Sequence, residues 1–281
     1  MPVAVVTDST AYLDAAESAM WGVTVVPLHV VIGGREFDDT ADPALTGVAE
    51  ALREHAPVTT SQPAPQRFAA AYAAAAAAGA DGVVSVHLSG SLSGTAEAAR
   101  LAAKDAPVPV EVIDSGSVGM GLGFPVLAAA DAARRGASLA EVVSAAGESA
   151  AATRSFFCVD TLEYLRRGGR IGAAVNLLGS ALAIKPLLHL ADGTITVLEK
   201  VRTANRAIAR LEDLAVQATA DGAVSVAVQH LGAAARARAL ADGLAARVPA
   251  ASRLTVVEVG AVIGAHVGPG LLGVTIAPAH P

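Results

Sequence analysis

Five polar residues in four short segments could together bind an anion. Thr60 and Ser61 lie in TSQP, Ser93 ends the run LSGSLS ahead of a predicted helix, Arg170 lies in RRGGRIG and His266 in GAHVGPG. Hydroxyl groups at the head of a helix can donate hydrogen bonds to a carboxylate, and the helix dipole and an arginine both favour its charge. We therefore predict that these five side chains converge on a carboxylate.

Each of these residues also has a plainer structural explanation. Thr60 and Ser61 could cap the helix that is expected to begin near Pro65. Arg170 could belong to a solvated turn, although the glycines before it allow the backbone to approach a ligand closely. Four Gly and Pro residues surround His266 and predict a tight loop between two apolar strands, a costly setting for an imidazole with no function.

Two other small-residue segments resemble catalytic or nucleotide motifs without matching them. In Gly90–Gly94 the position that a nucleophile elbow gives to serine holds Leu92, and the glycines of Gly119–Gly123 have the wrong spacing for a dinucleotide fingerprint. A serine hydrolase acting on acyl esters through Ser91 or Ser93 with His266 remains an alternative. So does a small-anion or sugar binder that uses the same loop.

Composition narrows the classes of ligand. With 26 acidic against 20 basic residues and a net charge of −6, the chain lacks the basic surface that attracts nucleic acids or anionic membranes. Aromatic residues make up only 3%, which disfavours stacking on bases or sugars. The longest apolar run, AAYAAAAAAGA, is too short to cross a bilayer. We expect no nucleic-acid partner and no stable membrane insertion.

The cysteine and histidine content indicates no metal site. The single cysteine, Cys158, lies in the apolar run FFCVD and is interpreted as a core residue. Neither HExxH nor CxxC occurs, and no P-loop is present, so we expect no metal and no cofactor. The chain begins directly with an apolar strand pattern, without a basic segment or a cleavage site, which is typical of a cytoplasmic protein.

The predicted fold is α/β with two domains, 1–152 and 153–281. In the first, short apolar strands alternate with helices, as in a mostly parallel sheet flanked by helices. In the second, a hairpin with the turn Asp192-Gly193 and strands separated by single helices predict a mixed or antiparallel sheet. Locally, we expect one strand over Val23–Ile32, and an irregular extended segment for Thr59, Thr60 and Ser61. The strand ends at Asp8 and Asp114 are interpreted as caps.

Taken in order along nearly the whole chain, the motifs resemble the DegV family of fatty-acid-binding proteins. The marks of the resemblance are VTDST, VVPLHVVIGG, TSQP, LSGSLSGT, IDSGSVGMGLG, LEYLRRGGRIG, IKPLL with DGTI, KVRT and GAHVGPG. The departures are small: the family often has serine at the positions of Gly90 and Gly119, and threonine at that of Val267.

The resemblance implies two α/β domains with a long-chain fatty acid buried between or within them. The family's carboxylate ligands match Thr60 and Ser93, with Arg170 and His266 in the same network. Such proteins present the carboxylate to a separate ATP-dependent fatty acid kinase, which forms an acyl phosphate for phospholipid synthesis. The carrier itself is then not an enzyme. We expect the acyl tunnel to be lined by four aliphatic residues: Leu177, Leu178, Leu182 and Ile184.

Overall fold

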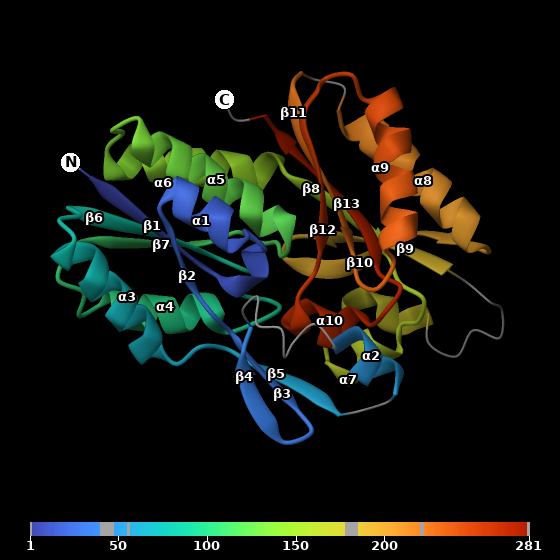
Figure 1. The fold of residues 1–281 in the computed structure, drawn as a ribbon, viewed down its shortest axis with the longest axis horizontal. Helices are drawn as coiled ribbons and strands as arrows, with labels where there is room; N and C mark the ends of the chain where they lie inside the picture. Colours follow the sequence, from blue (N-terminus) through green and yellow to red (C-terminus); the bar gives the residue numbers. More distant parts are fainter. Residues whose placement is uncertain (1, 40–47, 55–56, 178–184, 220–221, 280–281) are drawn as a thin grey trace.

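The computed structural model describes residues 2–39, 48–54, 57–177, 185–219 and 222–279 (Figure 1). Within these residues the chain forms three β-sheets: one of four strands, one of six and one of three. Helices cover the two larger sheets, and the small sheet lies below the junction between them (Figure 1). The predicted α/β class is confirmed, with a parallel first sheet and a mixed second one.

The first sheet is entirely parallel, in the order β2-β1-β6-β7. Helices α3 and α4 pack on one of its faces, and α5 and α6 on the other (Figure 1). A short helix α1 follows the 3-10 turn η1. The bounds are β1 Val3–Asp8, η1 Ser9–Ala11, α1 Ala15–Trp21, β2 Val23–Val26, α3 Pro65–Ala77, β6 Gly82–His87, α4 Thr95–Ala103, β7 Val110–Asp114, α5 Met120–Arg134 and α6 Leu139–Ala152.

The second sheet has the order β10-β9-β8-β13-β11-β12 and is antiparallel except for the pair β11 and β12. Helices α8 and α9 cover its outer face, and α5 and α6 contact it from the side of the first sheet. The bounds are β8 Arg154–Cys158, α7 Glu163–Arg167, η3 Gly172–Leu177, β9 Lys185–Ala191, β10 Thr194–Val201, α8 Ala204–Ala218, β11 Val224–His230, α9 Ala234–Arg247, β12 Ala251–Glu258, α10 Ala261–Val267 and β13 Leu272–Pro278.

The small third sheet, in the order β4-β3-β5, was not predicted. Its strands are β3 (His29–Ile32), β4 (Arg35–Asp38) and β5 (Val58–Ser61), and the helix α2 (Val48–Arg53) precedes β5. The single strand expected over Val23–Ile32 is wrong. The segment Pro27–Leu28 interrupts it, and its two halves join different sheets as β2 and β3.

Two further local expectations are corrected. Thr59, Thr60 and Ser61 are not irregular, because they pair with β3 as the antiparallel strand β5. His266 does not lie in a tight loop but in the last turn of α10. Four of the seven residues of this helix, Ala261, Val262, Gly264 and Val267, are buried. Gly268, with φ of 73°, ends it.

Other expectations hold. The turn of the β9–β10 hairpin has positive φ at both predicted residues, 48° at Asp192 and 74° at Gly193, the conformation of a type I′ turn. Cys158 is buried and forms no disulfide.

Of the four expected tunnel residues, Leu178, Leu182 and Ile184 lie outside the described residues. Leu177 ends η3, and only its backbone is described.

Candidate functional site

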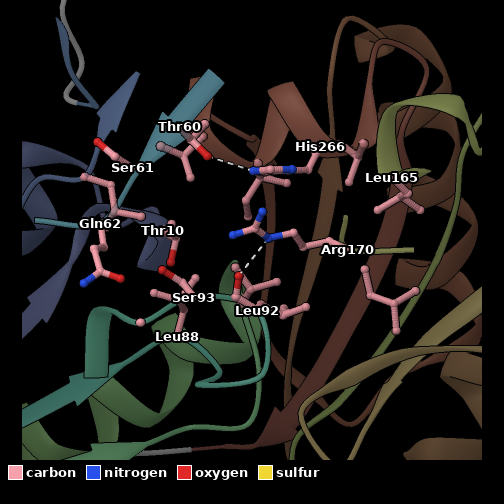
Figure 2. Close-up of a pocket in the computed structure, with 17 residues that line it drawn as sticks. Thr10, Thr60, Ser61, Gln62, Leu88, Leu92, Ser93, Leu165, Arg170 and His266 are labelled. Carbon is pink, nitrogen blue, oxygen red and sulfur yellow. Dashed lines mark hydrogen bonds between the residues drawn. The ribbon is translucent and has the colours of Figure 1, made fainter. Parts of the chain in front are cut away.

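A cavity of about 310 Å³ lies where the first sheet, the small sheet and α10 meet. One end of it is polar and the rest is apolar (Figure 2). The polar lining residues are Thr10, Thr60, Ser61, Gln62, Ser93, Arg170 and His266. The apolar ones are Leu28, Leu88, Leu92, Val118, Leu165, Ile195, Val262, Ile263 and Val267. All five residues predicted from the sequence therefore line one cavity, which we call the inner cavity.

Thr60 and His266 are joined although they lie 206 positions apart in the chain. The Thr60 Oγ1 atom lies 2.8 Å from Nε2 of His266 (Figure 2). Burial, and then the nearby Arg170 cation, lower the pKa of His266 to about 4. The imidazole is therefore neutral at pH 7, and one ring nitrogen carries no hydrogen.

The second ring nitrogen of His266 fixes which tautomer is favoured. Nδ1 is buried and has no hydrogen-bond partner among the described residues. A buried N–H group without a partner is rarer and costlier than an unpaired acceptor, so we assign the proton to Nε2. Nε2 then donates to Thr60, which leaves the Thr60 hydroxyl hydrogen available to a ligand.

Gly168 is the reason why the imidazole fits. A Cβ atom at residue 168 would overlap Nδ1 of His266, because the ring lies directly against the glycine backbone. Gly168 has φ of −75°, so the glycine is needed here for space and not for an unusual conformation. Gly168 thus serves a close approach, as the sequence indicated, but to His266, whereas Gly169 has open space around the position of a Cβ atom and φ of 69°.

Arg170 is fixed by two backbone carbonyl groups. Its Nε donates to Leu92 O at 2.9 Å and its Nη1 to Gly168 O at 2.6 Å. These bonds hold the guanidinium group between His266 and Ser93, beside the polar end of the inner cavity (Figure 2). The guanidinium group of Arg170 is planar and carries several N–H donors, a geometry that suits the two oxygens of a carboxylate.

Ser93 lies immediately before Gly94, the N-cap of α4. Its backbone N–H donates to Ser89 O, and its Oγ lies 2.8 Å from Oγ1 of Thr95. The Thr95 hydroxyl can be the donor in that pair, so Ser93 can turn its own hydrogen towards a ligand. The N-terminus of α4 adds a favourable potential for negative charge at this position.

Ser61 and Thr10 contribute differently from these residues. Ser61 lines the inner cavity but is exposed, and its hydroxyl points away from Arg170 (Figure 2). Thr10 is fully buried and its hydroxyl donates to Oδ1 of Asp8 at 2.6 Å. Asp8 caps η1 as predicted. Thr10 was not predicted as a lining residue, because capping was the expected role of the segment that begins at Asp8. Its place at the carboxyl edge of a parallel sheet was a signal.

Among the described residues, no hydrogen bond joins Ser91 or Ser93 to His266, as the hydrolase alternative would need. Ser89 donates to Gly193 O at 2.6 Å, and Ser93 is paired with Thr95. In the described residues, the chain Ser85–His87–Asp8 has the bonding order of a catalytic triad. However, all three side chains are fully buried, and Tyr72 donates to the Ser85 hydroxyl. We interpret this chain as a core network.

A second cavity, of about 520 Å³, shares Thr60, Arg170 and His266 with the inner cavity. We call it the outer cavity. Its other lining residues include Tyr164, Arg167 and Gly168. The polar end of the inner cavity therefore separates two hollows. Among the described residues, no group of three His, Cys, Asp or Glu side chains could hold a metal ion, and no helix could span a membrane.

Together these features define an α/β protein with an apolar cavity that ends in two hydroxyl groups, an arginine and a neutral histidine. The family model described as "Uncharacterised protein, DegV family" matches residues 2–279. A DegV domain-containing protein of Streptomyces coelicolor is 56% identical, with 98% of each chain covered. The chain belongs to the DegV family, as the sequence motifs indicated.

Solved structures agree with this assignment. A structure titled as fatty acid binding of a DegV family protein from Thermus thermophilus has a TM-score of 0.93 at 34% identity, covering 99% of this chain and 100% of the other. The structure of DegV from Bacillus subtilis, titled as a fatty acid binding protein, has a TM-score of 0.90 at 31% identity, with 99% and 100% covered.

Proposed function

We propose that this chain binds a long-chain fatty acid in the inner cavity. Thr60, Ser93 and Arg170 hold the carboxylate, with Ser61 beside them and His266 orienting Thr60. The observation that carries the proposal is the gathering of two hydroxyl groups and a fixed guanidinium at one end of an otherwise apolar cavity. The fatty acids in the titles of the Thermus and Bacillus structures support the same class of ligand.

The energetics of the site suit this ligand. A buried carboxylate is costly unless it is paired and hydrogen-bonded, and Arg170 with two hydroxyl donors supplies both. Each buried methylene of the acyl chain contributes about 0.8 kcal/mol. The apolar lining gives that chain its environment, whereas a sugar would leave its hydroxyl groups unpaired there.

Native mass spectrometry of the purified protein tests the proposal, followed by extraction and identification of the bound lipid. We expect one fatty acid adduct per chain. The double variant Thr60→Ala/Ser93→Ala should lose it, because the carboxylate then loses both hydroxyl groups that are proposed to hold it. The variant Thr59→Ala/Ser91→Ala, which removes two exposed hydroxyls from the same two segments, should keep it. An unloaded wild-type protein that takes up neither palmitate nor oleate would disprove the proposal.

We propose further that the bound carboxylate is presented to a separate ATP-dependent fatty acid kinase. A carboxylate oxygen would attack the γ-phosphorus of ATP while the bond to ADP breaks, giving an acyl phosphate. In this proposal the kinase brings ATP and Mg²⁺, and this chain is a non-catalytic carrier with no cofactor. The outer cavity supports the proposal, because it reaches Thr60 and Arg170 from the side opposite the acyl chain.

The variant Arg170→Ala tests the presentation step. With the fatty acid kinase of the same organism, ATP and Mg²⁺, we expect acyl phosphate formation to fall below detection when the product is trapped with hydroxylamine. The reason is that Arg170 alone balances the charge of the carboxylate within the described site. Arg100→Ala, which removes an arginine from the exposed side of α4, should leave the rate unchanged. Unchanged turnover of Arg170→Ala would remove this residue from the mechanism.

A further inference from the structure

A small third cavity of about 70 Å³ adjoins the inner cavity, and Arg170 is not among its lining residues. It shares four apolar lining residues with the inner cavity: Val118, Ile195, Ile263 and Val267. The two hollows therefore meet at this ring of side chains. We call the small cavity the tail pocket, because none of the proposed carboxylate-binding residues lines it.

Three residues that line the tail pocket carry polar side chains, unlike the rest of its lining. Gln229 of β11, Thr275 of β13 and Ser155 of β8 lie on the face of the second sheet turned towards α5. Gln229 Nε2 donates to Oγ1 of Thr275 at 2.9 Å, and Oγ1 of Thr275 lies 3.0 Å from Oγ of Ser155. Three neighbouring strands thus present one connected hydrogen-bonded row.

Contacts with the start of α5 fix the side chain of Gln229 in this polar row. Gln229 Oε1 accepts the backbone N–H of Met120, the first residue of α5, at 2.8 Å. The same oxygen lies so close to Gly119 that a Cβ atom there would overlap it. Gln229 is 9% exposed and Thr275 is fully buried. Gln229 therefore cannot swing aside without breaking two hydrogen bonds and leaving buried polar groups unpaired, which is costly.

We propose that Gln229, backed by Thr275 and Ser155, is the stop that sets the longest fatty acid this protein accepts. The inference rests on the proposed function and adds to it the residue that determines chain length. A chain that ends at the ring of four apolar residues, or just past it, gains from every methylene. A longer chain must push its methyl end into a hydrogen-bonded wall that cannot retreat.

Competition among chain lengths tests the stop. The delipidated protein is offered an equimolar mixture of even-numbered saturated fatty acids from laurate to arachidate, and the bound species are quantified by native mass spectrometry. Gln229→Ala removes the wall, so the ratio of the longest chains to the wild-type optimum should rise roughly tenfold or more, as expected for added methylene contacts in an apolar pocket. Gln217→Ala, the same change at an exposed position of α8, should leave the distribution unchanged.

A second variant works in the opposite direction and does not touch the polar row. Val118→Phe fills the junction between the two cavities and should shift the bound distribution to shorter chains. If Gln229→Ala fails to fold, Gln229→Ser, which shortens the side chain but keeps a hydroxyl group, takes its place in the same competition. A distribution that stays unchanged in a folded Gln229 variant would overturn the chain-length stop while leaving the carrier function intact. A wild-type protein that takes up no fatty acid would overturn the carrier function, and the stop with it.

Discussion

Gly168 shows how strongly a single residue without a side chain can constrain the carboxylate site. In Gly168→Ala the new methyl group must displace the His266 ring, and Thr60 then loses the partner that orients its hydroxyl. We expect fatty acid affinity to fall roughly 10- to 100-fold, which is the size of one hydrogen bond to a charged group. Titration of the delipidated protein with a fluorescent fatty acid measures this change.

A matched glycine serves as the control for that change. Gly147 lies in α6 with open space around the position of a Cβ atom, so Gly147→Ala should bind the fatty acid like the wild type. Both substitutions place alanine at a glycine without positive φ, so backbone strain does not separate them. Wild-type affinity in Gly168→Ala would show that His266 does not act through Thr60.

Helix α10 illustrates how an element can depend on residues far away in the sequence. Its first N–H, that of Ala261, donates to Asp39 Oδ1 at 3.1 Å, and that of Ile263 donates to the Tyr12 hydroxyl at 3.3 Å. At its other end His266 bonds to Thr60. The first half of the chain therefore holds this short helix at both ends, and so fixes the imidazole of the site.

The charge of Asp39 gives this arrangement a measurable pH dependence. Burial, more than any other cause, raises the pKa of Asp39 to about 6, and the nearby Asp8 adds to the shift. Between about pH 4 and pH 6 the folded protein thus binds more protons at Asp39 than the unfolded chain does. The Asp39 contribution to the free energy of unfolding therefore falls as the pH rises through this window, by about 2 kcal/mol.

The variant Asp39→Asn isolates that contribution because asparagine does not titrate. The free energy of unfolding of the variant minus that of the wild type should rise by about 2 kcal/mol between pH 4 and pH 6. Urea unfolding at a series of pH values measures the difference. His266, whose pKa is lowered, acts in the opposite direction in both proteins and largely cancels in the subtraction. A difference that stays flat across the window would contradict the burial of a charged Asp39.

The same elements show what the sequence could and could not predict. The β9–β10 hairpin was predictable because its turn depends on two adjacent residues, Asp192 and Gly193. Helix α10 could not be predicted, because seven residues with an internal glycine are too few to show a helical pattern of apolar residues. The groups that accept hydrogen bonds from its first turn, on Tyr12 and Asp39, are also far away in the sequence. Strand β5 was missed for a similar reason, because its pairing partner β3 lies outside the local pattern.

The candidate site followed the same rule. Thr60, Ser93, Arg170 and His266 were predictable because they lie in segments whose glycines, prolines and hydroxyls already looked unusual. Gln229 could not be predicted, because it lies within an apolar strand pattern. Its proposed role in limiting chain length depends on contacts with Met120 and Thr275. Residues that act through tertiary partners carry no local signal.

At the scale of the whole molecule, the two predicted domains share one large hydrophobic cluster, and each also has a cluster of its own. A division between residues 152 and 153 remains our proposal for the topology, since α6 ends at Ala152 and β8 begins at Arg154. However, one cluster of buried side chains joins Val84 and Val142 of the first half to Leu188 and Val262 of the second. Arg253 of β12 also pairs with Glu17 of α1 across the junction. Neither half can therefore unfold without exposing buried side chains of the other half.

This shared core predicts a single cooperative unfolding transition. Trp21, the only tryptophan, ends α1 and packs against the shared cluster, so its fluorescence reports on the first half. Far-UV circular dichroism reports on both halves. In urea at neutral pH the two signals should give the same midpoint, because two-state unfolding makes different probes coincide. Midpoints that differ clearly would show that the halves unfold separately. In that case a ligand at their junction would raise the midpoint of only one transition, whereas with a shared core added fatty acid should raise both probes' midpoints together.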